Sequence, residues 1–417
     1  MENLPTEIIR EVCGSFCLHC TEPPDPRFLF MHPGVRERQA LAKLCLTSSK
    51  LRAIAQPLLY HRIFISERQK SLSIPLLNTL ISRPDLAQAV RHLTITDMCT
   101  ERNIIDDAVL SRLTLAARQR GLPLSDDWIE DHDLQPHSLM QQLLLQVPHV
   151  ELVAFLSLSY QIWDLLGSVD SATRSLPTLR KVVLDCYDTE MGYDLSIVTS
   201  LFSLAPNLNK LSLFQCCSVS NTLSLRNVTC LALEASWISA DDMSRLLSSC
   251  GKLDTFVYDG SADMISDGAP RVSANGLVRM LEEQGHSRTL RRLSLNFFTT
   301  SSEAREDVNS LAGFPQLHEL SLEYVLLRWP QATPTNAQAG ILPASVEGIN
   351  LHGLAEELND ILELVVAQAS NGLCPGLKRI AFNIPSGDND ATLGNLRRRF
   401  QDLGISCLSR RNWPVYS

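Results

Sequence analysis

The feature that most constrains this chain is a short apolar pattern that returns along most of its length. The pattern is apolar-x-x-apolar-x-apolar, and Leu211 and Leu213 are the last two apolar positions of one copy. Copies begin at residues 90, 150, 179, 208, 228, 253, 290, 317, 346 and 377, and a similar segment begins at Tyr60. Alternating apolar residues are typical of a β-strand, and recurrence at a roughly constant interval is typical of a repeat protein. We therefore expect these ten copies to form parallel strands of one sheet, in chain order.

Amphipathic helical patterns separate several of these strands. They cover residues 195–204, 240–247, 277–283 and 358–366. Ser239 and Ser273 precede two of them, where a hydroxyl can accept a hydrogen bond from a free backbone N–H of the first turn. One strand–helix unit cannot bury its apolar face alone, so stacked units are expected to share a continuous core. The alternative is a doubly wound α/β domain, but no glycine-rich phosphate-binding turn follows any strand.

Composition and charge exclude several classes of protein. The chain is 45% hydrophobic, with a net charge of −9, and no apolar run reaches the roughly 18 residues that a membrane helix needs. Residues 1–65 carry eight basic and six acidic side chains, net +2, which leaves 29 and 40, net −11, for the rest. An acidic body argues against nucleic-acid binding. Because the N-terminus lacks a signal-peptide pattern, we expect a cytoplasmic or nuclear protein with reduced cysteines and no membrane partner.

Residues from about 60 to 410 resemble leucine-rich repeats of the longer, helix-containing type. The resemblance implies an α/β solenoid, a horseshoe with parallel strands on one side and helices on the other. That family places Asn or Cys three residues after the last strand leucine, where the side chain bonds to backbone groups of the turn. Cys216 fits this position, whereas Phe298, Val325 and Leu354 occupy it in other copies, so the repeats are degenerate.

Residues 4–60 follow a different, helical pattern. Leu4-Pro5-Thr6-Glu7-Ile8-Ile9 reads as a helix start, because proline suits the first turn and Glu7 favours the positive end of the helix. Two further helices are expected at residues 40–47 and 49–55. A proline-rich insertion, near residues 19–38, separates them from the first helix. Three short helices are marginal alone, so they are expected to pack on each other, on the repeats or on a partner.

This N-terminal segment resembles an F-box, in the form that precedes leucine-rich repeats in filamentous-fungal proteins. The resemblance rests on residues 4–9, 44–52 and 57–60. It implies a small all-α domain over residues 1–60, followed by the repeat array at 61–417, and docking to the Skp-type adaptor of a cullin–RING ubiquitin ligase. The apolar contacts that it implies are Leu4, Pro5, Ile8, Ile9, Leu44 and Leu46. The alternative is that these residues only cap the N-terminal edge of the solenoid.

Two groups of residues raise the question of a metal ion. Cys13, Cys17, His19, Cys20 and His32 have a spacing near that of a zinc site, but zinc modules usually pair two short ligand elements and only a loose one is present. We therefore expect ordinary reduced cysteines and no metal ion or other cofactor. The acidic run at 126–133 lacks the alternating spacing and the glycine of a calcium loop, and we expect a solvated loop.

Catalytic signatures are missing from the sequence. It contains no Gly-x-Ser-x-Gly, no Gly-x-x-x-x-Gly-Lys and no His-Glu-x-x-His. A repeat fold also offers an open face, whereas chemistry gains from a dry and preorganised site. We expect a protein that is not an enzyme.

The leading hypothesis is the substrate-receptor subunit of a ubiquitin ligase, with an unidentified target protein bound by the repeats. Residues that follow the last apolar position of each strand include Asp185, Phe214, Glu234 and Asp259, which would form a target surface with Phe214 as its apolar anchor. The alternative for these residues is that their charges only solvate the sheet and pair laterally. Two other functions stay open: a leucine-rich-repeat scaffold without a ligase connection, and a repeat-type regulator of a small GTPase.

Overall fold

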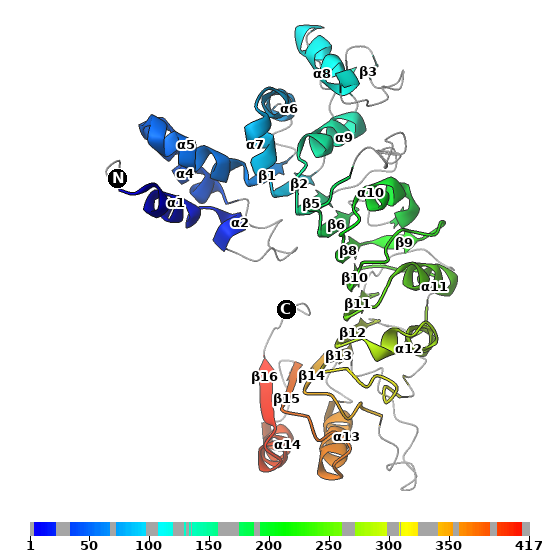
Figure 1. Cartoon of the computed structure of the whole chain (residues 1–417). Helices are drawn as coiled ribbons and strands as arrows, with labels where there is room; N and C mark the ends of the chain where they lie inside the picture. Colours follow the sequence, from blue (N-terminus) through cyan, green and yellow to red (C-terminus); the bar gives the residue numbers. More distant parts are fainter. Residues whose placement is uncertain are drawn as a thin grey trace. The chain divides into compact units, whose positions relative to one another are not determined.

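The core of the fold is one open, 12-stranded parallel sheet whose strands follow the order of the chain (Figure 1). The computed structural model describes residues 4–21, 34–66, 72–96, 107–119, 129–130, 133–134, 136–156, 175–186, 192–260, 272–297, 308, 310–323, 341–352, 358–383 and 390–410. All ten copies of the apolar pattern form strands of this sheet, and the segment at Tyr60 supplies its first strand. The predicted parallel sheet in chain order is therefore confirmed.

Each strand of the sheet except the last begins two residues into its copy of the pattern. The strands are β1 (Arg62–Ile65), β2 (His92–Thr96), β5 (Leu152–Leu156), β6 (Lys181–Asp185), β8 (Lys210–Phe214), β10 (Cys230–Glu234), β11 (Thr255–Asp259), β12 (Arg292–Asn296), β13 (Glu319–Glu323), β14 (Gly348–His352), β15 (Arg379–Asn383) and β16 (Ser406–Arg410). The last of them, β16, lacks the apolar pattern and was not predicted. Two small sheets pair β3 (Ile129–Glu130) with β4 (Asp133–Leu134) and β7 (Tyr193–Asp194) with β9 (Cys216–Ser218).

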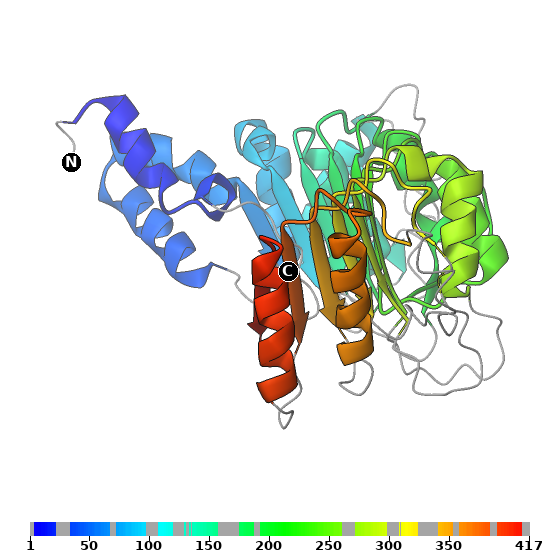
Figure 2. The ribbon, with the colours of Figure 1, turned by 90° about the horizontal axis from the view of Figure 1, so that it is seen from below.

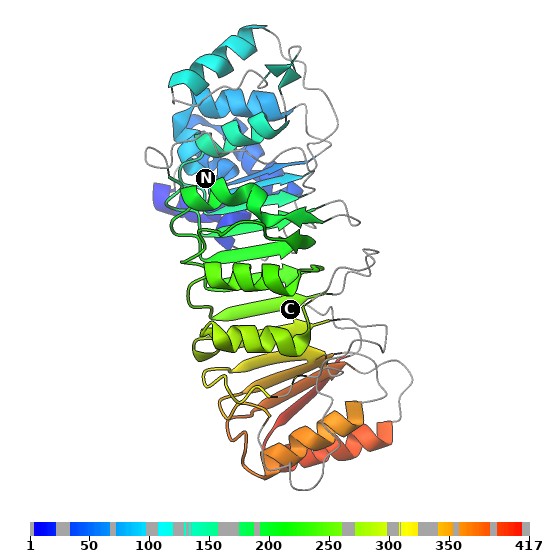
Figure 3. The ribbon, with the colours of Figure 1, turned by 90° about the vertical axis from the view of Figure 1, so that its right-hand side faces the viewer.

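Helices precede the first strand and lie in several of the connections between strands. They are α1 (Thr6–Gly14), α2 (Leu18–Thr21), α4 (Val35–Thr47), α5 (Ser49–Tyr60), α6 (Ser73–Ser82), α7 (Pro84–Ala89), α8 (Asp107–Gln119), α9 (Pro136–Gln146), the 3-10 helix η3 (Leu195–Val198), α10 (Thr199–Leu204), α11 (Ala240–Ser249), α12 (Ala274–Glu283), the 3-10 helix η4 (His286–Arg288), α13 (Leu358–Ser370) and α14 (Asp390–Asp402). Helices α11 and α12 lie on the same side of strands β10 to β12 (Figures 1 and 3). Helices α13 and α14 pack side by side next to the C-terminal strands (Figure 2). All four expected helical segments between strands are helical.

The chain divides into two compact units. One comprises Met1–Asp188 and Leu195–Ser212, and the other comprises Thr189–Asp194 and Leu213–Ser417. The N-terminal helices thus share a compact unit with the first strands.

The repeated pattern forms strands for two physical reasons. Its first apolar residue is buried in every copy, as are the paired leucines Leu211 and Leu213 or Leu320 and Leu322, so each strand is fixed by removal of apolar surface from water. Its second residue joins neighbouring strands: the His61 carbonyl accepts from the N–H groups of Arg91 and His92, at 2.9 and 2.8 Å. Equivalent pairs of backbone bonds recur along the sheet and fix one register throughout.

The N-terminal helices α1, α4 and α5 surround a small apolar core of their own. Its buried members are Ile9, Cys13, Leu41, Cys45, Leu51 and Ala55. The Ser48 hydroxyl caps α5 by accepting from Leu51 N at 3.3 Å, and Arg52 Nε donates to the carbonyl of Cys45 at 2.9 Å. The three helices predicted here are confirmed, with α4 beginning at Val35 rather than at Ala40.

None of the helices in the described part of the chain is long and apolar enough to cross a membrane. Several parts of the sequence discussed above lie outside the described residues: most of the proline-rich insertion, residues 126–128 and 131–132 of the acidic run, and His32, Phe298, Val325 and Leu354.

Candidate functional site

Three apolar side chains in the N-terminal segment are exposed. They are Leu4, Ile8 and Leu46, which are 40%, 43% and 80% exposed, and we call them together the N-terminal patch. Ile8 lies in the first turn of α1, and Leu4 lies two residues before the helix. Singly exposed apolar residues are normal on a protein surface, whereas a contiguous exposed patch marks an interaction site.

The start of α5 is hydrogen-bonded to the residue two positions before α1. Lys50, in the first turn of α5, donates from Nζ to the carbonyl oxygen of Leu4 at 2.9 Å. Pro5 is exposed at the N-cap of α1, where its carbonyl accepts the N–H of Ile9 at 3.1 Å. Proline has no N–H that the helix start would leave unpaired, so it suits this place.

Two of the six apolar residues expected to contact a partner are placed differently. Ile9 is fully buried in the core of α1, α4 and α5, and Leu44 is partly buried against the same core. One residue along an α-helix turns the side chain by about 100°, which separates Ile8 from Ile9. Ile9 therefore supports the patch from inside and is not part of its surface, which corrects the expectation from the sequence.

The four residues expected to form a target surface are the last residues of β6, β8, β10 and β11; three of them are partly buried and one is buried. Asp185 belongs to the first compact unit, and Phe214, Glu234 and Asp259 belong to the second. Asp259 is only 1% exposed, and the next members of the row, Asn296, Glu323 and His352, are buried as well. Asp259 is thus corrected from a surface residue to an interior one.

Part of this row has a structural role in the turns. Glu323 Oε2 accepts from the backbone N–H of Phe297 at 3.1 Å, and the carbonyl of Asp259 accepts from Ser236 N at 3.0 Å. Burial raises the pKa of Asp185 to about 6, partly offset by the backbone N–H of Cys186.

Charges in the third position of the pattern pair along the sheet. Arg379 on β15 forms an ion pair with Glu319 on β13, across the intervening strand β14. Gly348 on β14 makes room for it, because a Cβ there would lie 2.6 Å from Glu319 Oε2 and 2.7 Å from Arg379 Nε. This pair fits lateral pairing of charges rather than a surface kept free for a partner.

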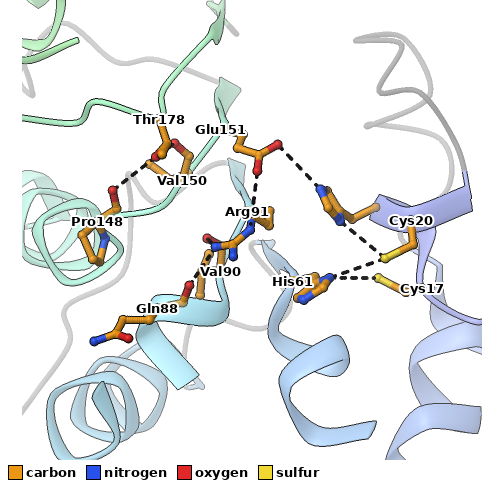
Figure 4. Close-up of polar contacts among 11 residues, drawn as sticks. Cys17, Cys20, His61, Gln88, Val90, Arg91, Pro148, Val150, Glu151 and Thr178 are labelled. Carbon is orange, nitrogen blue, oxygen red and sulfur yellow. Dashed lines mark hydrogen bonds and ion pairs between the residues drawn. The ribbon is translucent and has the colours of Figure 1, made fainter. Parts of the chain in front are cut away.

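A cluster of thiol and imidazole groups lies where the turn after α1 meets the end of α5. Cys17, His19 and Cys20 come from that turn and from α2, and His61 joins α5 to β1. Their ligating atoms all lie within 4.8 Å of one another. Figure 4 shows Cys17 and Cys20 pointing toward His61, and Arg91 paired with Glu151 nearby.

Burial sets the charge of the imidazoles at this cluster. Burial, together with smaller effects of His19 and Arg91, lowers the pKa of His61 to about 4. The ring of His19 packs edge to face against His61 and His92, with ring centroids 5.1 and 4.7 Å apart. Burial also lowers the pKa of His92, to about 3, so the rings of His61 and His92 are neutral at pH 7.

Sequence reasoning grouped three members of this cluster, expected ordinary reduced cysteines there, and missed the fourth member. Cys17 and Cys20 have Cys-x-x-Cys spacing, which is a signal for a metal site. Cys13, grouped with them by sequence, lies in the core of α1, α4 and α5 instead. His61 is 41 residues from Cys20, inside a copy of the strand pattern, so nothing in its local sequence links it to the cysteines.

No model of a known protein family and no curated protein matches this sequence.

Proposed function

We propose that this chain is the substrate-receptor subunit of a cullin–RING ubiquitin ligase, acting in the cytoplasm or nucleus. The N-terminal helices dock a Skp-type adaptor, and the strand–helix array holds a target protein. The observation that carries the proposal is the N-terminal patch, where Leu4, Ile8 and Leu46 are exposed over a separate, well-packed helical core. These residues fall within the segments that resemble an F-box.

The burial pattern favours docking over the cap alternative. A cap would turn its apolar face toward the sheet, whereas α1 buries Ile9 and Cys13 against α4 and α5, and Ile8 and the preceding Leu4 stay partly exposed. Covering the patch would remove apolar surface from water at about 25 cal/mol per Å².

The proposed role is positioning and not chemistry. A receptor that holds a target and an adaptor at once raises the effective concentration of the target near the conjugating enzyme. No residue of this chain takes part in bond making or breaking in the proposal. With Asp259 buried, the target surface is assigned to the repeat array as a whole.

The test is capture of a purified Skp-type adaptor by the full chain and by the double variant Ile8→Asp/Leu46→Asp. We expect the variant to lose at least about tenfold in affinity, which corresponds to about 1.4 kcal/mol. Both side chains are exposed, so the free energy of unfolding is expected to change by less than about 0.5 kcal/mol for each substitution.

The matched control is Leu115→Asp, which charges a leucine on α8 that is also exposed. It is expected to capture the adaptor as well as the wild type does. Equal capture by wild type and by the double variant would contradict the proposal. Failure of the folded wild type to bind any Skp-type adaptor would favour a scaffold without a ligase connection.

A further inference from the structure

Four side chains from two separate segments converge at the end of the N-terminal helices. Cys17 is buried, His19 and His61 are partly buried, and Cys20 is exposed. We propose that Cys17, His19, Cys20 and His61 bind one zinc ion in a structural Cys₂His₂ site. The proposal does not depend on the proposed function, and it replaces the expectation of ordinary reduced cysteines at these positions.

The spacing of the ligand atoms fits a tetrahedral zinc ion. With zinc–sulfur and zinc–nitrogen bonds of about 2.3 and 2.0–2.1 Å, a regular tetrahedron places a sulfur and a nitrogen about 3.6 Å apart. Nδ1 of His61 lies 3.6 Å from Sγ of Cys17 and 3.6 Å from Sγ of Cys20. Nδ1 of His19 lies 3.7 Å from Sγ of Cys20. All three distances agree with a shared central ion.

The surroundings of His19 provide a second, independent observation. Its other ring nitrogen, Nε2, lies 3.7 Å from Oε2 of Glu151, whose Oε1 lies 3.5 Å from Nε of Arg91. Histidines that bind a metal commonly direct the remaining ring N–H at a carboxylate, which fixes the orientation of the ring. Glu151 lies just before β5 and stands in the right place for this role.

The ligand set favours zinc in a closed site. Two thiolates and two imidazoles are the donors of structural zinc sites, and four protein ligands leave no open position for a substrate. On binding, the two thiols release their protons to solvent, and the zinc ion takes their place. Hydrogen bonds alone explain the arrangement of the cluster less well than a shared ion, because Nδ1 of His61 lies at the same distance from the sulfur atoms of Cys17 and Cys20.

Zinc would join two parts of the first compact unit. The turn that holds Cys17 and Cys20 ends α1, whereas His61 begins the strand ladder through its carbonyl, which accepts from Arg91 and His92. The metal would therefore fix the helical segment to the first strands. This position explains why His61, a member of the strand pattern, directs its ring at the cysteines.

The first experiment uses the wild-type full chain, purified under a reducing agent, supplied with zinc chloride and then desalted. Elemental analysis is expected to give about one zinc per chain, and X-ray absorption to give two sulfur and two nitrogen neighbours at the bond lengths of a tetrahedral site. Absence of bound zinc from the folded, reduced wild type would overturn the proposal. So would a bound ion with oxygen ligands only.

The second experiment assigns the ligands with the variants Cys20→Ser and His61→Asn. Each is expected to lose at least about tenfold in zinc affinity, measured by competition with a chromophoric chelator. The matched controls are Cys217→Ser and His149→Asn, which change a cysteine and a histidine outside the cluster and are expected to bind like the wild type. Undiminished binding by Cys20→Ser and His61→Asn would overturn the site. If a variant fails to fold, X-ray absorption of the wild type still decides the ligand set.

Discussion

At the scale of single residues, burial rather than residue type separates the roles of side chains. Ile8 and Ile9 are adjacent and identical in chemistry, yet one is exposed at the N-terminal patch and the other is fully buried. Asp185 and Asp259 occupy the same place in two copies of the pattern, but only Asp259 is almost completely covered. A pattern of apolar and polar residues does not determine these differences, because they depend on what packs above each position.

Asp185 gives a prediction about pH. Burial raises its pKa in the folded chain to about 6, compared with 3.8 for an exposed carboxyl. A raised pKa means that the proton binds the folded state more tightly than the unfolded state. The contribution of this proton to the free energy of unfolding is therefore complete below about pH 4 and is lost as the pH rises through 6. Asn resembles the protonated carboxyl. Relative to Asp185→Asn, the wild type is expected to lose about 1–3 kcal/mol of stability between pH 4 and pH 7.5.

Urea unfolding of both proteins at several pH values measures this difference. The same series on Asp254→Asn serves as the control, because Asp254 is an accessible partner of Arg291 at 3.5 Å. A constant difference between the wild type and Asp185→Asn from pH 4 to 7.5 would show that the carboxyl titrates as it does in water.

At the scale of elements, the local sequence pattern predicts most of the strands and helices of the fold. Ten copies of six residues located ten strands, because each copy contains the first apolar residue and the leucine pair that the core buries. The helix starts at Ser239 and Ser273 were also correct, with side-chain oxygens that accept from Asp242 N and Gly276 N at 3.1 Å. Strands and helix caps can be predicted from the sequence because the hydrogen-bond donor, its acceptor and the apolar residues that form one face lie within a few residues of each other in the chain.

The cap of α12 can be tested separately from the repeat packing. Ser273→Ala leaves the N–H of Gly276 without its side-chain acceptor and is expected to cost about 1 kcal/mol. Ser273→Asp keeps an acceptor at the same place and is expected to cost much less. The measurement is the free energy of unfolding from urea titration, and equal losses in the two variants would assign the effect to the hydroxyl's packing and not to the cap.

Long-range features could not be predicted in the same way. His61 and Cys20 are neighbours only because α5 brings the chain back to the turn after α1, and no local signal reports that return. The strand β16 lacks the pattern and exists because β15 offers it an edge with free backbone groups, along which it pairs in parallel from Arg379 and Ser406 onward. Burial of Asp259 likewise depends on neighbouring turns and not on its own copy of the pattern.

At the scale of the whole molecule, the two compact units carry different parts of the proposed function. The first holds the N-terminal patch and the cysteine–histidine cluster, and the second consists mainly of strand–helix units. In repeat folds each unit contacts mainly its sequence neighbours, so damage to one unit spreads over a short distance. Adaptor docking and repeat packing are therefore expected to respond separately to mutation.

Leu293→Ala tests that separation. Leu293 lies inside β12 and is buried, so its truncation is expected to cost about 2–5 kcal/mol through lost burial and the cavity left behind. Amide hydrogen exchange, read segment by segment, is expected to quicken in β11, β12 and β13, which pair in register around this residue, and to stay unchanged in α1, α4 and α5. Adaptor capture should match that of the wild type, since the patch rests on a separate helical core.

Leu408→Ala, which trims an exposed leucine of β16, is the control and is expected to alter neither exchange nor capture. Loss of protection in α1, α4 and α5 together with β12 would show that the whole chain unfolds as one cooperative unit, and loss of capture with those helices intact would place part of the adaptor surface on the repeats.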